Sequence, residues 1–288
     1  MLTHEQTKYS QQGFSNFVSA LDAILRANGS YLTVKVSDKN RAIKKRISFK
    51  EFLITQLKFT FLEINWLWYR NNFFGFLKNY KQVKSIFGTR LVEFKNFLKN
   101  YPTFEYQALR FQNIRLSMVY LFESFLDSGS EFAIIFEDDA DFLDYKKQAN
   151  LVHETLRMLS KIPKGENNIF MNISESYSPT ELGIEHLMRV YLDTDEYLKD
   201  SGSKIYSLTK PAANTTAAII CDQKFVERIL IFYKKLSLNL GTGYKFMPLD
   251  WTINRFMIET FKYEKILCFT VYPGLIPQLS LKSRRQKT

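Results

Sequence analysis

Residues 131–142 read EFAIIFEDDADF, an apolar stretch that changes abruptly into an acidic one. The five residues 132–136 have the composition of a strand that is buried on both faces of a sheet. Four carboxylates then follow within five positions, and they belong to Glu137, Asp138, Asp139 and Asp141. In open α/β sheets, ligands bind just beyond the carboxyl ends of strands. The stretch therefore predicts a buried strand that leads into an acidic binding site.

The acidic stretch stands out because the whole chain is basic, with a formal net charge of +11 over 288 residues. Four ionised carboxylates this close together repel one another, and a divalent cation relieves the repulsion. Clustered hard oxygen ligands suit Mg²⁺ or Mn²⁺. A solvated acidic turn, with aspartates that cap the next helix, is the alternative interpretation. The positive net charge favours an anionic partner, which can be a nucleic acid, a phospholipid surface or a small molecule.

Compartment signals are few. Residues 1–14 lack the apolar core of a secretory signal, and no apolar stretch reaches the roughly 18 residues of a membrane span. The two cysteines, Cys221 and Cys268, lie in separate apolar runs, which favours buried free thiols in a reducing compartment. We expect a cytoplasmic location, with peripheral attachment to the inner membrane face left open.

The order of elements predicts an α/β fold. A helix over 14–27 ends at Asn28-Gly29, a strand is expected over 31–36, a basic helix over 42–57 and a second strand over 59–64. This β-α-β order is typical of a parallel sheet with crossover helices. The later expected elements are a helix over 106–127, a strand over 167–173, a strand and helix over 214–236, a helix that starts near Pro248, and a last strand and loop over 265–280.

Residues 65–105 differ in composition from the rest of the chain. Between positions 65 and 100, seven Lys or Arg residues are accompanied by one acid, Glu93. The pattern fits amphipathic helices with lysines on a solvated face, or a basic and aromatic surface for anionic lipid or a large acceptor. We expect one domain over 1–288, with 65–105 as a helical insertion and 281–288 as a disordered basic tail.

Several segments resemble one enzyme family in the same order along the chain. IIFEDDADF resembles the acidic segment of glycosyltransferase family 25, which includes bacterial lipooligosaccharide galactosyltransferases. The other similar segments are YLTVKVSDKNRAIKKR, IRLSMVYLFESFLDSGSEFAIIFEDD, NTTAAIICDQKFVERIL, MPLDWTIN and YPGLIPQLS, so that the resemblance covers residues 31–280. It implies a GT-A-like fold with a mostly parallel, Rossmann-like sheet, a nucleotide-sugar donor and a divalent cation, Mn²⁺ or Mg²⁺.

The resemblance also implies roles for individual residues. Asp139 is the metal ligand common to two possible pairs, in which Glu137 or Asp141 is its partner. The residues expected to bind the donor are Asp138, Arg46, Asn214, Thr215, Thr216 and Gln278. Asp250, at a helix start, is a candidate general base if the reaction inverts, or a plain helix cap. Trp251 beside it is expected to stack on an acceptor sugar, or to belong to the core.

The resulting hypothesis is a metal-dependent glycosyltransferase. It would move a sugar from a nucleotide-sugar donor, by default a UDP-hexose such as UDP-galactose, to a cell-surface glycan such as lipopolysaccharide, lipooligosaccharide or capsule. One alternative is a metal-dependent nuclease or phosphotransferase, which also needs clustered acids. Another is a non-catalytic protein that binds a membrane or nucleic acid. Because no recognised nucleic-acid motif is present, no nucleic-acid partner is expected.

Overall fold

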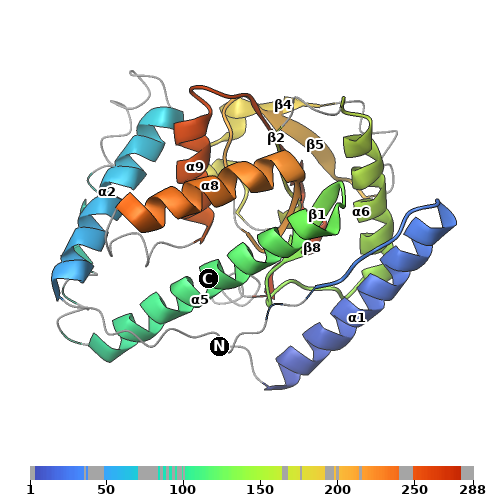
Figure 1. Cartoon of the computed structure of the whole chain (residues 1–288), viewed down its shortest axis with the longest axis horizontal. Helices are drawn as coiled ribbons and strands as arrows, with labels where there is room; N and C mark the ends of the chain where they lie inside the picture. Colours follow the sequence, from blue (N-terminus) through green and yellow to red (C-terminus); the bar gives the residue numbers. More distant parts are fainter. Residues whose placement is uncertain are drawn as a thin grey trace. The chain divides into compact units, whose positions relative to one another are not determined.

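The computed structural model describes residues 4–35, 37, 49–70, 84, 87–88, 91–92, 95, 99, 101–163, 168–175, 177–191, 198, 201–213, 216–239 and 249–279 (Figure 1). The chain divides into two compact units. The sheet unit comprises Met1–Val34, Ser128–Phe225 and Lys265–Thr288, and the helical unit comprises Lys35–Asp127 and Val226–Glu264. The single domain expected over 1–288 stays a prediction, because two compact units can belong to one catalytic domain.

The sheet unit is built on a six-stranded sheet with the order β1-β6-β2-β7-β5-β4. β2 and β7 pair in parallel, and the other neighbouring strands pair antiparallel. The α/β class is therefore confirmed, but the mostly parallel sheet is wrong, since β6 runs antiparallel between β1 and β2. The GT-A assignment stays a prediction. The strands are β1 (Phe132–Phe136), β2 (Asn168–Asn172), β4 (Met188–Val190), β5 (Lys204–Leu208), β6 (Ala218–Asp222) and β7 (Ile266–Tyr272).

β1 confirms the strand predicted from the FAIIF stretch, but not its burial on both faces. It lies at the edge of the sheet and pairs with β6, in a register that sets Phe132 opposite Asp222 and Phe136 opposite Ala218. Ile135 is fully buried, whereas the other four residues of the strand are partly buried. An edge strand has a neighbour on one side alone, which explains the lower burial.

Helices α1 (His4–Ala27) and α6 (Tyr145–Ser160) pack on each other and on one face of the sheet (Figure 1). Ile169 and Met171 of β2 face these helices, and Phe170 between them packs against Phe225 on the other face. This alternation is the two-residue period of a strand. Gly29, with φ of 75°, ends α1 as expected from the Asn-Gly signal.

Shorter elements complete the sheet unit. β3 (Ser174–Glu175) and β8 (Ile276–Pro277) form a separate parallel pair. Between β3 and β4 lie α7 (Pro179–Leu182) and the 3₁₀ helix η1 (Glu185–Leu187). α7 begins with a capping box, in which Ser178 accepts from the Glu181 backbone N–H and the Glu181 carboxylate accepts from the Ser178 N–H. Cys221 and Cys268 are free and buried, as predicted.

The helical unit contains α2 (Phe49–Arg70), α5 (Tyr101–Ser128), most of α8 (Gln223–Asn239) and α9 (Leu249–Thr260). α5, α8 and α9 confirm helices expected near these positions. The strand expected over 59–64 is wrong, because these residues lie inside α2, where Leu62, Trp66 and Leu67 are buried at helical spacing. The strand expected over 31–36 is also not formed, since the described residues 31–35 belong to no strand.

The predicted insertion falls partly outside the described residues. Within 65–105, residues 65–70 end α2, residues 101–105 begin α5, and the described positions between 84 and 99 are helical. The helix expected over 42–57 is described from residue 49 onward, and the tail 281–288 lies outside the described residues. Among the helices described, none is both long and apolar enough to cross a bilayer.

Candidate functional site

Strand directions bring several chain segments together at one end of the strands, which is called here the carboxyl edge of the sheet. β1 and β2 are each antiparallel to β6 and therefore run the same way, and β7 is parallel to β2. The carboxyl ends of these three strands lie at the same edge, together with the start of β6. The acidic residues follow β1, Ser174 follows β2, Pro273 and Gly274 follow β7, and Thr216 precedes β6. This edge is where an α/β sheet is expected to bind a ligand.

The acidic loop is hydrogen-bonded to the backbone at the end of β8 and just after it. The N–H of Asp141 donates to the carbonyl of Pro277 at 2.8 Å, and the N–H of Leu279 donates to the carbonyl of Asp139 at 2.9 Å. Ala140 and Gln278 form an antiparallel bridge between these bonds. The two bonds flank Ala140 and fix the backbone next to Asp139, which favours a well-ordered binding residue.

Asp139 and Gln278 meet through their side chains. Gln278 Nε2 donates to Asp139 Oδ2 at 2.9 Å. The two side-chain oxygens that take no part in this bond, Asp139 Oδ1 and Gln278 Oε1, are buried and have no hydrogen-bond partner among the described residues. Buried polar atoms without a partner are costly, and each one in a folded protein calls for an explanation. A bound cation is one partner that two such oxygens can share.

The other acidic residues of the loop have different surroundings. Glu137 accepts a hydrogen bond at Oε1 from Thr216 Oγ1, and its backbone N–H donates to the Ala217 carbonyl at 3.0 Å. Asp141 is 5% exposed, whereas Asp138 is exposed. Glu137 is thus hydrogen-bonded to the residues before β6, Asp141 is buried, and Asp138 is exposed to solvent. The four carboxylates therefore have different surroundings.

The residues at this edge fit a Mg²⁺ or Mn²⁺ ion that a substrate helps to hold. In the part of the chain that the structure describes, no group of three or more His, Cys, Asp or Glu side chains is placed to hold a metal ion. Mg²⁺ is usually bound by one or two carboxylates together with substrate phosphates and water, rather than by a full protein cage. Asp139 Oδ1 and Gln278 Oε1, which lack partners among the described residues, would supply the protein's share of such a site.

The predicted donor-binding residues have mixed outcomes. The structure brings Thr216 and Gln278 to the acidic loop, as hydrogen-bond partners of Glu137 and Asp139. Arg46, Asn214 and Thr215 lie outside the described residues, so that their roles stay predictions.

Asp250 and Trp251 lie in the helical unit, at the start of α9. The Trp251 backbone N–H donates to Asp250 Oδ1 at 2.9 Å, and burial raises the pKa of Asp250 to about 6. The Trp251 ring packs edge-on against the buried Trp66, with 6.4 Å between ring centroids. That contact gives Trp251 a packing role; stacking on an acceptor sugar stays a prediction.

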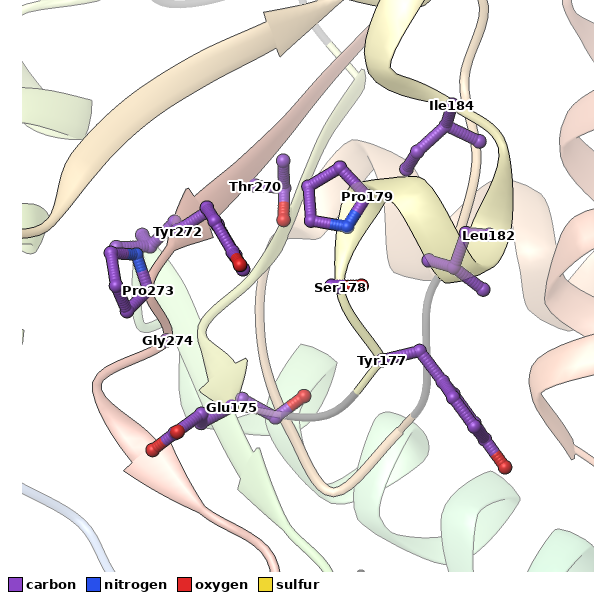
Figure 2. Close-up of a pocket in the computed structure, with 12 residues that line it drawn as sticks. Glu175, Tyr177, Ser178, Pro179, Leu182, Ile184, Thr270, Tyr272, Pro273 and Gly274 are labelled. Atoms are coloured by element: carbon purple, nitrogen blue, oxygen red, sulfur yellow. The ribbon is translucent and has the colours of Figure 1, made fainter.

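A small pocket at the same sheet edge was not predicted from the sequence. It has a volume of about 130 Å³ and lies where β2 and β7 end. Figure 2 shows Tyr272 and Pro273 on one side of it and Pro179, Leu182 and Ile184 on the other, with Glu175 and Tyr177 at the lower edge of the view. Tyrosine rings next to a carboxylate and hydroxyl groups are suited to a small polar ligand with an apolar face.

Gly274 allows the pocket wall to close. A Cβ atom at this position would lie 2.2 Å from the backbone nitrogen of Glu175 and 2.4 Å from the carbonyl oxygen of Ser174. Only glycine lets the segment after β7 approach β3 this closely. The Pro-Gly pair directly after an apolar strand, and the Ser-x-x-Glu pattern that caps α7, are the sequence signals that could have indicated this region.

A comparison of the chain with protein families, with characterised proteins and with solved structures found no match.

Proposed function

We propose that this protein is a glycosyltransferase that uses a nucleotide-sugar donor and a divalent cation. The observation that carries the proposal is the pair of Asp139 and Gln278, which has two buried oxygens without hydrogen-bond partners among the described residues, close to where β1 and β8 end. The family resemblance of the sequence supports the same conclusion. A UDP-hexose is the default donor, and a cell-surface glycan is the default acceptor.

Asp139, with the amide oxygen of Gln278, would hold the Mn²⁺ or Mg²⁺ ion. When bound there, such an ion supplies positive charge that neutralises the departing nucleotide diphosphate. Glu137 helps to set the shape of the loop, because Thr216 holds its carboxylate and Ala217 holds its backbone. The metal role predicted for Glu137 and Asp141 stays a prediction, and we propose Asp139 as the principal metal ligand.

The remaining donor-binding roles are those that the family resemblance implies. The exposed Asp138, with Thr216, Arg46, Asn214 and Thr215, is assigned to the donor. The pocket beside Tyr272 is lined by tyrosine rings, a carboxylate and hydroxyl groups, so we assign it to a sugar ring.

The reaction breaks the bond between the anomeric carbon and the diphosphate and forms a bond from that carbon to an acceptor oxygen. The acceptor hydroxyl loses a proton in this step. Asp250 is proposed to take it if the enzyme inverts, because a carboxylate whose pKa is about 6 is a stronger base than an ordinary aspartate and is still ionised at pH 7. If the enzyme retains configuration, the departing diphosphate is the alternative proton acceptor.

The test is hydrolysis or transfer across a panel of nucleotide sugars, with Mn²⁺ and with EDTA. We expect turnover of at least one donor with Mn²⁺ and little with EDTA, and a loss of about 100-fold in kcat/KM for Asp139→Asn, which keeps the side-chain shape and removes the charge. Asp144→Asn is the matched control, since Asp144 is exposed and makes no capping hydrogen bond to α6. Wild-type turnover in Asp139→Asn, or no turnover of any donor, would contradict the proposal.

A further inference from the structure

α2 is apolar on two faces. Leu62, Trp66 and Leu67 are buried in the helical unit, as a packed helix requires. A second set of large apolar side chains on the same helix is exposed to solvent. Its members, here called the apolar stripe, are Leu53 (41% exposed), Leu57 (53%), Phe61 (70%) and Trp68 (47%).

The apolar stripe follows the period of the helix. Its residues are spaced by four, four and seven positions, so that they lie along one side of α2 at about 100° of rotation per residue. Lys50 and Asn65 are exposed on the same side. Single exposed apolar residues need no explanation, but several large ones along one helix face are typical of a surface that a partner covers.

Basic residues accompany the exposed apolar residues in this part of the chain. Between positions 65 and 100 the sequence has seven Lys or Arg and one acid. The described residues between 84 and 99 are all helical and exposed. They combine three lysines with three large apolar side chains and a glycine: Lys84, Phe87, Gly88, Leu91, Val92, Lys95 and Lys99.

We propose that the apolar stripe of α2 docks on an anionic phospholipid surface, with the helical residues between 84 and 99 contributing positive charge. Helices that lie in a membrane interface carry Leu, Phe and Trp beside lysines. Protein interfaces, by contrast, are depleted in lysine, which argues against a second copy of the chain as the occupant. None of the described helices could cross a bilayer, so the contact lies in the interface plane. The inference is independent of the proposed catalytic function.

Sedimentation of the full chain with vesicles tests this surface. We expect binding to phosphatidylcholine vesicles that contain 50% phosphatidylglycerol, much weaker binding to pure phosphatidylcholine, and a decrease as salt is raised. Leu57→Ser combined with Phe61→Ser should weaken binding about tenfold or more, because both side chains are largely exposed and leave the core intact. Tyr263→Ser, at a residue 87% exposed outside the stripe, should stay within about twofold of wild type.

Tryptophan fluorescence gives an independent signal, because the chain has three tryptophans. Trp66 is buried and Trp251 packs against it, whereas Trp68 is exposed on the stripe. Anionic vesicles should shift the emission to shorter wavelength, and Trp68→Phe should abolish the shift while vesicle sedimentation stays within about twofold of wild type.

Two results would overturn the inference. One is equal sedimentation of the wild type and the double serine variant. The other is a concentration-dependent dimer of the wild type that becomes a monomer in the double variant without any vesicle binding, which would assign the stripe to a second copy of the chain. Neither readout uses donor turnover, so a failed docking test would not bear on the proposed glycosyltransferase activity.

Discussion

Gln278 Nε2 donates a hydrogen bond of 2.9 Å to Asp139 Oδ2, and the two residues are 139 positions apart in the sequence. The backbone around them is also paired, through the bridge between Ala140 and Gln278. The segment after β8 therefore fixes both the path of the acidic loop and the orientation of its central carboxylate. A carboxylate held in this way would need little reorganisation to bind a ligand.

Gln278→Ala should lower both the free energy of unfolding and the proposed metal-dependent turnover. The change leaves Asp139 Oδ2 without its amide donor in a partly buried place, which should lower the free energy of unfolding by about 1–2 kcal/mol. Urea denaturation measures this difference. Gln12→Ala is the control, because Gln12 is exposed on α1 and bonds to Asn16 of the same helix, and its change should cost less than about 0.5 kcal/mol. Equal unfolding midpoints for Gln278→Ala and wild type would show that the bond contributes nothing.

Thr216→Val should loosen Glu137 while the volume of the side chain is kept. Thr216 is buried, and its hydroxyl donates to Glu137 at the point where β6 begins. We expect a loss of about 1–2 kcal/mol in the free energy of unfolding and a lower kcat for the proposed transfer, since the acidic loop loses its hydrogen bond from Thr216.

Thr155→Val provides a matched control for that change. Thr155 is also buried, and its hydroxyl donates to a carbonyl of its own helix, Leu151. Valine there should change stability by less than Thr216→Val does and leave kcat unaltered. If both variants had the same kcat as wild type, the tie between Thr216 and Glu137 would be purely structural.

Gly274→Ala should be strongly destabilising. The added Cβ would lie 2.2 Å from the Glu175 nitrogen, so the segment after β7 must move away from β3. Overpacking of this kind costs about 1–3 kcal/mol or more, and the pocket beside Tyr272 would change shape. Gly88→Ala is the control, because Gly88 is helical with open space around its Cβ position, and alanine there should raise stability by about 0.5–1 kcal/mol. Thermal unfolding curves should show a lower midpoint for Gly274→Ala and a higher midpoint for Gly88→Ala than for wild type.

Local patterns predicted most elements of the chain. The FAIIF stretch, the Asn-Gly stop after α1 and the helical spacing in α5 and α8 depend on neighbouring residues, and the structure confirms these elements. The strand expected over 59–64 failed because FTFLEI is apolar enough for either structure. The burial of Leu62, Trp66 and Leu67 and the packing of α2 on α9 decide in favour of a helix.

The acidic residues of the candidate site could be predicted from the sequence, but the hydrogen bonds that hold them could not. The sequence places the four carboxylates after a strand, and the family resemblance named Thr216 and Gln278. Neither indicates that Gln278 bonds to Asp139 or that Thr216 bonds to Glu137, because strand pairing across more than 70 positions creates these contacts. The direction of β6 was missed for the same reason, since short apolar strands carry no local signal of their orientation.

Asp250→Asn should change how stability depends on pH. Burial raises the pKa of Asp250 to about 6 from its ordinary 3.8, so the folded state binds more protons than the unfolded state between these values. The stabilisation from this residue is therefore complete below pH 4 and is lost as the pH rises through about 6. Asparagine resembles the neutral acid and does not titrate, so the variant should gain stability relative to wild type as the pH increases from 4 to 7.

The gain should be about 2 kcal/mol, less than the roughly 3 kcal/mol that a pKa of about 6 in place of 3.8 would give, because residue 250 is only partly buried by solvent accessibility. Asp222, whose pKa burial also raises to about 6, contributes the same kind of slope to both proteins and cancels in the difference. Urea denaturation at pH 4, 5, 6 and 7 measures the two curves. Parallel curves over this range would mean that the carboxyl of Asp250 titrates like a solvated one, and they would remove the basis for its proposed role as a base.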